Sequence, residues 1–405
     1  MNKFLSTILF IIGICNGAKT GDYFELRNGL QNSKFVFKNT RQGRVVFMGG
    51  SITNMEGWKE LVSVDLKRRF PETQFEFINA GIDSTGSTPG AFRLTRDAFK
   101  QGKVDLLFVE SAVNDAISGR SDQEEIRGME GIVRHARKLN PDIDIIMMYF
   151  VDPEKMATYN QGKVPNVIQN HEKVARRYQV PSINLALEVT ERIKKGEFSW
   201  EKDFKGLHPA PFGHKIYSNT IARCFDAAWN NDLSETLSAH PLPEKVDKYN
   251  YEHGKLCSPE NAEKLNGFKF FPEWKNTDKT ATRPGFVDVP MLVGESPGNS
   301  FELYFKGSAI GLFVVAGPDT GIIEYRVDDG KWEAKDTFTR WSGGIHLPAL
   351  YVLAAELDKK KTHKLEVRIA KQKNKNSKGN ACRVVNIAVN GILTSGKSRT
   401  FEEMD

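Results

Sequence analysis

Apolar residues in this chain follow two different patterns, and the change from one to the other divides the sequence. From Arg44 onward, short continuous apolar runs alternate with stretches whose apolar residues recur at helical spacing. Continuous short runs are typical of strands buried on both faces, and helical spacing is typical of amphipathic helices. The expected strands cover residues 45–48, 75–78, 104–109, 143–150 and 182–185.

Helical patterns lie between these strands and set the expected fold class. One helix face carries Trp58, Leu61, Val62 and Leu66. Ser121 and Glu124 have the form of a capping box ahead of a second apolar face. Alternating strands and helices predict an α/β domain, a three-layer α/β/α sandwich around a parallel sheet. Ligands of such sheets bind beyond the carboxyl ends of the strands.

After about residue 231 the pattern changes to short alternating segments with turn signals. A polar, proline-bearing stretch around residues 238–243 has the composition of a linker, and Asp328-Asp329-Gly330 is a hairpin-type turn. The expected strands here cover residues 301–305, 310–315, 322–327, 351–357, 364–369 and 383–389. Many short strands with turns predict an all-β sandwich of the jelly-roll type.

The amino terminus has the layout of a secretory signal. Met1-Asn2-Lys3 precedes a mostly apolar run over residues 4–14 and small residues up to Ala18. That run is too short for a comfortable membrane span. Cys15 leaves a lipid-anchored alternative open, although Ile14 is a poor match to the small residue that such a site has before its cysteine. We expect secretion or periplasmic export.

The expected organisation follows from these boundaries. It comprises a signal peptide over 1–18, an N-terminal strand segment over 19–43, the α/β domain over 44–232, a linker over 233–262 and the β-sandwich over 263–405.

Length, net charge and cysteine content indicate the number of domains, the kinds of partner and the disulfides to expect. A chain of 405 residues suits two domains and can bury a core without disulfides. The net charge of +6 is modest, and the lysine clusters lack the interleaved aromatic residues of a nucleic-acid surface, so no nucleic-acid partner is expected. Cys224, Cys257 and Cys382 allow either one disulfide with a leftover thiol or three buried free thiols.

Ser51 stands where the first expected strand gives way to a helix. Gly49 and Gly50 precede it and allow close approach of the backbone, and the following helix directs N–H groups toward a developing anion. An isolated Gly-Gly-Ser is more often a helix cap. Three further segments in a fitting order favour a nucleophile instead.

These three segments follow later elements. The loop Asp83-Ser84-Thr85-Gly86 comes after the second strand and can offer backbone N–H groups. Asn114 follows the third strand and supplies an uncharged amide donor, although with Asp115 it can also form an Asx-turn. His208 precedes a proline that is expected to open the last helix, and it can reach back to Ser51.

The four segments, Gly-Gly-Ser, the glycine loop, Val-Asn-Asp and His-Pro, resemble the blocks of the SGNH (GDSL-type) hydrolase superfamily over roughly residues 44–229. The resemblance implies a secreted, carbohydrate-esterase-like member with a C-terminal β-sandwich. It also implies that Ser51 is the nucleophile and His208 the general base. The implied oxyanion-hole donors are the backbone N–H of Ser51, a loop residue from Ser84 to Gly86, and the side chain of Asn114.

The chain departs from the family pattern at the acid that orients the histidine. The family usually places an Asp three residues before the histidine, where this chain has Lys205. Asp203 is the first candidate to replace it, and Glu201 or a backbone carbonyl are the others. The expected catalytic set is therefore Ser51, His208 and Asp203, with a Ser-His dyad as the open alternative.

No metal or other cofactor is expected. His208 and His214 have no third ligand nearby at zinc spacing, and His214 is expected to be a surface or boundary residue. The glycine loop around residues 81–90 lacks the Gly-Lys-Ser/Thr ending of a nucleotide loop.

The predicted chemistry is hydrolysis of an ester. A hydroxyl that attacks an ester carbonyl creates a tetrahedral oxyanion, which neutral donors stabilise without reorganisation. An imidazole, with an ordinary pKa of ~6.5, can take the serine proton and return it to the leaving alcohol. We therefore expect a serine-dependent carboxylic ester hydrolase, resembling carbohydrate acetylesterases, whose partner is an acylated polysaccharide or glycan.

Two other functions stay open. One is a glycan-binding protein whose hydrolase domain has lost catalysis, and the other is an acyltransferase that uses the same site. Accessory sandwiches of secreted hydrolases often hold carbohydrate, by analogy. Trp332, Trp341 and His346 are candidates for a sugar-stacking surface, with burial in the core as the commoner explanation.

Overall fold

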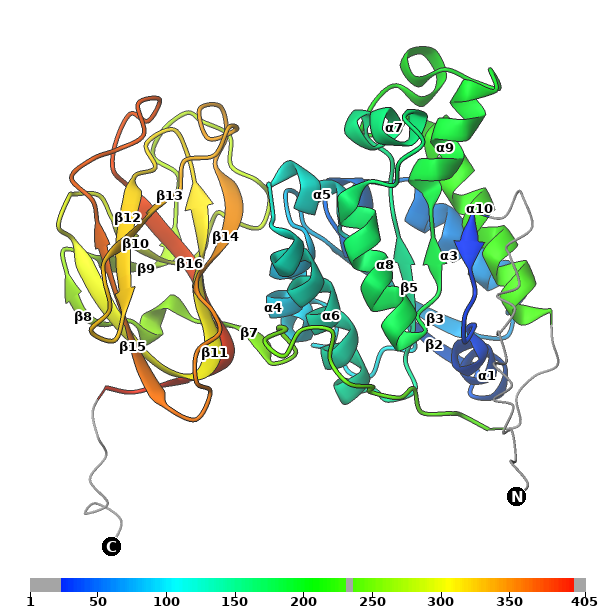
Figure 1. Cartoon of the computed structure of the whole chain (residues 1–405), viewed down its shortest axis with the longest axis horizontal. Helices are drawn as coiled ribbons and strands as arrows, with labels where there is room; N and C mark the ends of the chain where they lie inside the picture. Colours follow the sequence, from blue (N-terminus) through cyan, green and yellow to red (C-terminus); the bar gives the residue numbers. More distant parts are fainter. Residues whose placement is uncertain (1–22, 231–235, 397–405) are drawn as a thin grey trace, which may run out of the picture.

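The computed structural model describes residues 23–230 and 236–396, which form two domains side by side (Figure 1). The first domain is built on a six-stranded sheet with the order β1-β6-β5-β4-β2-β3. Its strands are β1 (Phe24–Glu25), β2 (Gln42–Gly49), β3 (Gln74–Gly81), β4 (Leu106–Glu110), β5 (Asp144–Met148) and β6 (Ser182–Ile183). All are parallel except β1, which pairs antiparallel with β6. The predicted α/β class is confirmed.

Helices cover both faces of this sheet. One face carries α1 (Gln31–Asn39), α3 (Trp58–Arg69) and α10 (Pro211–Trp229), and the other carries α4 (Ser87–Asp97), α6 (Asp122–Leu139) and α8 (Asn166–Tyr178). Aromatic rings fill the first interface: Trp58 of α3 packs edge-on against Phe47 of β2, and Phe225 of α10 against Phe108 of β4. The remaining helices are α2 (Ser51–Asn54), α5 (Ala112–Ile117), α7 (Pro153–Asn160), α9 (Leu185–Lys194) and the π-helix η1 (Trp200–Phe204).

The segment before β2 was expected to contain only strands, but it also contains a helix. It contributes the short edge strand β1 and then the helix α1, whose Phe37 is fully buried against Phe70, Phe75 and Trp229. The capping box that was predicted at Ser121 is present at the start of α6. Leu61, expected on the buried face of α3, is 41% exposed, whereas Trp58, Val62 and Leu66 are buried.

The second domain is an antiparallel β-sandwich. Its strands are β7 (Gly254–Cys257), β8 (Glu263–Asn266), β9 (Lys269–Trp274), β10 (Val289–Gly294), β11 (Ser300–Ala316), β12 (Ile322–Val327), β13 (Glu333–Asp336), β14 (Leu347–Ala354), β15 (Thr362–Ile369) and β16 (Cys382–Thr394), with the short 3-10 helix η2 (Pro259–Asn261) after β7. Asp328 takes a left-handed conformation at the turn between β12 and β13, which confirms the predicted hairpin.

The strands expected over 301–305 and 310–315 are a single strand, β11. Its first half pairs with β15 and its second half with β14. The register with β16 shifts between Gly307 and Ala309, and such irregularities bend a strand. β11 therefore takes part in both layers of the sandwich, which an interrupted apolar pattern cannot distinguish from two strands.

The two domains share part of one apolar core. Tyr251, just before β7, packs against Phe92 of α4, and β7 itself pairs with β16 of the sandwich. Phe313 and Leu350 of the sandwich belong to the same buried cluster as the α/β core, whereas the interior of the sandwich is a separate cluster. Two ion pairs cross the interface, Arg127 with Glu356 at 2.5 Å and Asp83 with Arg283 at 2.8 Å.

The expected signal peptide and Cys15 lie outside the described residues. Within the described ranges, no helix combines the length and the apolar character that crossing a membrane requires. The three cysteines Cys224, Cys257 and Cys382 are free thiols. Burial raises the pKa of Cys224 and of Cys382 to about 12.

Candidate active site

The candidate site lies at the carboxyl end of β2, where the order of the sheet reverses. β3 flanks β2 on one side and β4 on the other, although the chain visits β3 before β4. The loops that follow these three strands therefore meet, as is usual for ligand sites of α/β sheets. Ser51 is the first residue of α2 and follows β2 directly through Gly50.

The Oγ of Ser51 lies 2.7 Å from Nε2 of His208. The loop that holds His208 is fixed by a hydrogen bond from the Ala210 N–H to the Phe204 carbonyl, 2.9 Å long, and by the buried ring of Pro209. The proline that opens α10 is Pro211, two positions beyond the one expected. The imidazole itself is exposed, which leaves room for a substrate beside it.

The groups predicted to donate to an oxyanion have no hydrogen-bond acceptor within the described structure. The backbone N–H groups of Ser51 and Gly86 and the side-chain amide of Asn114 donate no hydrogen bond to any residue that the structure describes. Asn114 lies against Gly50, because a Cβ built on Gly50 would fall 1.9 Å from the Asn114 Oδ1. Ser84 has a left-handed backbone, φ 64°, in the loop that leads to Gly86.

Asp115 connects the segment after β4 to the start of α4, on the buried side of both. Its Oδ1 accepts the Ser87 N–H at 2.9 Å, and its Oδ2 lies 3.1 Å from Nε2 of His171. Asp115 and His171 are both fully buried. Gly86 leaves no room for a side chain, since a Cβ there would lie 2.0 Å from the Asp115 carboxylate. The loop after β4 and the start of α4 therefore hold each other in place.

The structure does not bring Asp203 to His208. The Asp203 carboxylate accepts hydrogen bonds from the N–H of Ser199 at 2.8 Å and from its hydroxyl at 3.1 Å, so it closes the turn of η1 on itself. No carboxylate among the described residues lies within ion-pairing distance of the His208 ring, and this includes Glu201. Ser51 therefore contacts a His208 ring that neither Asp203 nor Glu201 touches, and the Ser-His dyad stays a prediction.

His214 is buried, 3% exposed, and is not the surface or boundary residue expected from the sequence. Neither of its ring nitrogens has a hydrogen-bond partner in the described structure. The ring lies against Gly57, where a Cβ would approach it to 2.4 Å. Burial lowers the pKa of His214 to about 4. Over the described ranges, no group of three or more His, Cys, Asp or Glu side chains is arranged to hold a metal ion.

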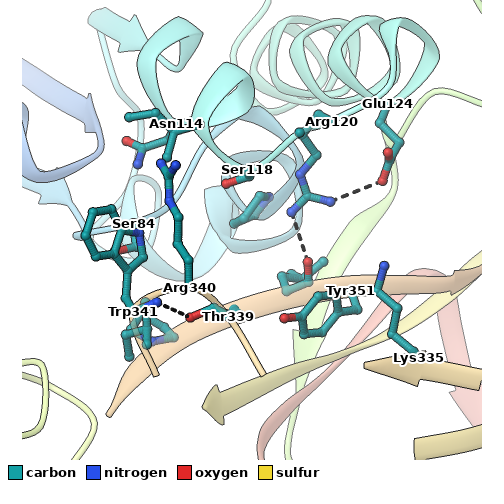
Figure 2. A pocket seen from close by; sticks show the side chains of 17 residues that line it. Ser84, Asn114, Ser118, Arg120, Glu124, Lys335, Thr339, Arg340, Trp341 and Tyr351 are labelled. Carbon is teal, nitrogen blue, oxygen red and sulfur yellow. Dashed lines mark hydrogen bonds and ion pairs between the residues drawn. The ribbon is translucent and has the colours of Figure 1, made fainter. Parts of the chain in front are cut away.

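A cleft of about 390 Å³ opens between the two domains beside the candidate site (Figure 2). Ser84 and Asn114 line it from the α/β domain, and Arg340, Trp341 and Tyr351 line it from the sandwich. In Figure 2 the Arg340 side chain extends from the sandwich toward Asn114. Trp341 is 55% exposed, so its ring faces solvent in the cleft.

The three residues proposed as one sugar-stacking surface do not form one. Trp341 lies in the cleft, Trp332 is half-buried under the guanidinium groups of Arg326 and Arg368, and His346 is fully buried beside Trp274. Arg340 was missed by sequence reasoning. Its position next to an exposed Trp in a glycine-bearing turn was the available signal, but nothing in the pattern pairs that turn with Asn114.

Comparisons with known proteins agree with this architecture. The model of the GDSL-like lipase/acylhydrolase family matches residues 47–216. A two-domain esterase (CEX) active on acetylated mannans superposes with a TM-score of 0.69 at 20% identity, over 90% of this chain and 98% of that chain. The structure of such an esterase co-crystallized with mannopentaose gives a TM-score of 0.68 at 20% identity, over 93% and 100% of the two chains. No curated protein sequence matches the chain.

The family match confirms the resemblance seen in the sequence and, with it, the predicted class of carboxylic ester hydrolase. The structural likeness, at 20% identity, extends the agreement in fold to both domains. Residues 47–216 of this chain thus form a domain that matches the GDSL-like lipase/acylhydrolase family model, and a C-terminal β-sandwich follows it.

Proposed function

We propose that this protein is an exported serine esterase that removes O-acyl groups, above all acetyl groups, from a polysaccharide or glycan. The observation that carries the proposal is the 2.7 Å contact between Ser51 Oγ and His208 Nε2, with unpaired donors on Ser51, Gly86 and Asn114 around it. Export rests on the signal-like sequence of residues 1–18.

The proposed reaction begins when His208 takes the hydroxyl proton of Ser51 and the oxygen attacks the ester carbonyl. The carbonyl oxygen becomes an oxyanion, which the N–H groups of Ser51 and Gly86 and the Asn114 amide stabilise. His208 then returns the proton to the leaving sugar hydroxyl, which departs as the acyl-Ser51 ester forms. Water attacks that ester with the help of His208 and releases acetate and the free serine.

His208 works in this proposal without a carboxylate partner. A carboxylate normally holds the catalytic imidazole in the reactive tautomer, and replacing it by an amide has cost about four orders of magnitude in turnover where the site depends on it. Here the hydrogen bond to Ser51 and the loop closed by the hydrogen bond from the Ala210 N–H to the Phe204 carbonyl do the orienting. A modest turnover number is therefore expected.

The cleft between the domains supports a glycan as the substrate. An exposed aromatic ring beside polar groups is the usual way for a protein to bind a sugar, and Trp341 has that position next to Asn114. The two superposable structures are of an esterase active on acetylated mannans, in one case co-crystallized with mannopentaose. An oligosaccharide chain that crosses the cleft would bring one acyl group to Ser51.

The proposal is tested by the release of acetate from acetylated oligosaccharides by the purified protein and by its Ser51→Ala variant. The wild type should release acetate, and the variant should lose essentially all of this activity, because no other nucleophile replaces the hydroxyl. Ser118→Ala, which changes a hydroxyl that also lines the cleft, is the matched control. Equal activity of wild type and Ser51→Ala would remove Ser51 from the mechanism.

The lack of a carboxylate beside His208 also favours a second candidate, a glycan-binding protein with an impaired hydrolase domain. The same assay separates the two. Saturable binding of acetylated glycans without any acetate release by the wild type would support the binding protein. Acetate that appears on an added sugar hydroxyl, instead of free in solution, would indicate the acyltransferase.

A further inference from the structure

We propose that the cleft recognises a negatively charged sugar, so that the substrate is an acidic acylated glycan, with Arg340 and Lys335 as the residues that select it. The inference rests on the proposed esterase function and adds the class of its substrate. The anionic group is a carboxylate or a sulfate ester, on the acylated sugar or on its immediate neighbour.

Neither of these two cations has an anionic partner in the part of the chain that the structure describes. Arg340 and Lys335 both line the cleft and are exposed. No Asp or Glu carboxylate in the described part of the chain lies within ion-pairing distance of either one. Two uncompensated positive charges therefore face the cavity in which the glycan is expected to bind.

The other charged groups at the cleft are already paired. Arg120 donates hydrogen bonds to Glu124 at 3.1 Å and to the Leu350 carbonyl at 2.9 Å (Figure 2). Glu124 is the one acidic residue of the described chain that lines the cleft, and it is therefore already paired. Asp83, beside Ser84, is bound to Arg283. No other acid in the described ranges lines the cleft, so Arg340 and Lys335 leave it with two unpaired positive charges.

Both cations are held over aromatic rings. The Arg340 guanidinium lies 4.8 Å from the ring centre of Trp341, and the Lys335 ammonium lies 5.0 Å from that of Tyr351. Such contacts restrict a long side chain without neutralising its charge. The two charges are therefore positioned before a ligand arrives, which reduces the entropy that binding would cost.

The choice of an anionic sugar follows from the chemistry of these groups. A neutral sugar needs a stacking ring and neutral hydrogen-bond partners, which Trp341, Asn114 and Ser84 already provide. A guanidinium matches the geometry of a carboxylate or a sulfate, and charge-assisted hydrogen bonds are about twice as strong as neutral ones. Arg340 extends toward Asn114, so the anion it binds lies close to the acyl group that is cleaved.

The experiment measures acetate release from a panel of acetylated oligosaccharides in matched pairs. Each uronate-containing oligosaccharide is paired with the same oligosaccharide after reduction of its carboxyl groups to alcohols, and sulfated oligosaccharides are paired with their desulfated forms. Acetylated manno-oligosaccharides serve as the neutral reference. We expect kcat/KM to be at least about tenfold higher for a charged member than for its neutral partner.

Single substitutions then test whether Arg340 and Lys335 cause the preference for charged oligosaccharides. Arg340→Gln should reduce the charged-to-neutral ratio of kcat/KM about tenfold, Lys335→Gln should reduce it by less, and both effects should shrink in high salt. Lys373→Gln removes the same charge from an exposed site outside the cleft and should leave the ratio unchanged. A ratio that responds equally to all three variants would overturn the assignment to the cleft.

The remaining outcomes each decide a question. A preference for the sulfated pair alone identifies sulfate as the anion, and a preference for the uronate pair alone identifies the carboxylate. Acetate release with no preference in any pair overturns the inference and leaves the esterase intact. Ser51→Ala tests binding without turnover: if it binds charged and neutral partners equally well, the inference fails by itself. No acetate from any substrate removes the proposed function and this inference with it.

Discussion

In the proposed mechanism, the side chain of Asn114 donates to charge that is present mainly in the transition state. Its amide donates to no residue in the described structure, and it lies beside Gly50, the residue before Ser51. Removing one such donor costs about 100- to 1000-fold in turnover. Asn114→Ala should therefore lower kcat by that factor and change KM little, as measured by steady-state kinetics on one acetyl ester.

The control for this prediction is Asn160→Ala, which removes an exposed amide at the end of α7. It should leave both constants near wild type. A rise in KM at constant kcat in Asn114→Ala would instead mean that the amide binds the ground-state substrate, and the oxyanion role would fall.

Two buried histidines make stability depend on pH. Burial lowers the pKa of His214 and of His135 to about 4, below the ordinary value near 6.5 that applies in the unfolded chain. Between these values the unfolded chain binds protons that the folded chain does not, so stability should fall as the pH drops from about 6.5 to 4. It should be fully present above that window.

Urea unfolding midpoints at pH 7.5 and pH 5 measure the effect. The difference between the two midpoints should shrink in His214→Leu, because this variant has no proton to bind at that position. An unchanged difference would show that His214 is protonated alike in both states. Lower stability of the variant at both pH values is a separate packing effect and does not bear on this prediction.

Single residues were predictable from the sequence where their role depends on chain order. Ser51, Asn114 and His208 each follow or precede an identifiable element, so their convergence could be anticipated. Asp203 could not be judged in this way, because the direction of its carboxylate depends on the π-helical turn that binds it to Ser199. The backbone conformation of that turn sets the direction, and composition does not encode it.

At the level of elements, the turn from β2 into α2 depends on the space between Gly50 and the loop after β4. Gly50 has φ −89°, which any residue can adopt, so its lack of a side chain is required by space alone. A Cβ there would meet the Asn114 Oδ1 at 1.9 Å. Gly50→Ala should therefore displace the amide and lower kcat nearly as much as Asn114→Ala does.

A double-mutant cycle tests that explanation. In the Asn114→Ala background the clash has no partner, so adding Gly50→Ala should cost little further activity. Additive losses would mean that Gly50→Ala disturbs Ser51 directly and not through Asn114. Circular dichroism of each variant checks that the fold is retained.

Whole strands and helices could be predicted from the sequence where their burial produces a clear apolar pattern. The central strands β2, β4 and β5 were found because both of their faces are covered and their apolar runs are continuous, as in β4 with every residue buried. The helix α1 was missed because three of its four buried residues, Asn32, Ser33 and Lys34, are polar, so it shows no apolar face. β11 was divided in two because Lys306 and Gly307 interrupt its apolar pattern where the strand changes partners.

On the scale of the molecule, the cleft belongs to neither domain alone. Asn114 and Trp341 are far apart in the sequence and line the same cleft only because the sandwich docks against α4 and α6 through residues around Tyr251. Sequence patterns report burial along one segment at a time. They predicted both domains, but they contain no signal for which turn of the second domain faces the site of the first.

The shared core predicts that the two domains unfold together. Leu350 is 2% exposed and packs in the cluster that spans both domains, while the interior of the sandwich, with Leu303, is a separate cluster. Heat unfolding followed by calorimetry should show one transition, with equal calorimetric and van't Hoff enthalpies. Leu350→Ala should cost about 2–5 kcal/mol, as a truncated core side chain does.

Leu303→Ala distinguishes coupling through the interface from simple loss of packing. It should destabilise by a similar amount and keep the single transition, because the domain contact is intact. If Leu350→Ala weakens that contact, its transition should broaden or split while the Leu303→Ala transition stays sharp. Two resolved transitions already in the wild type would contradict the shared core as a cooperative unit, and the cleft would then have to form from domains that are stable separately.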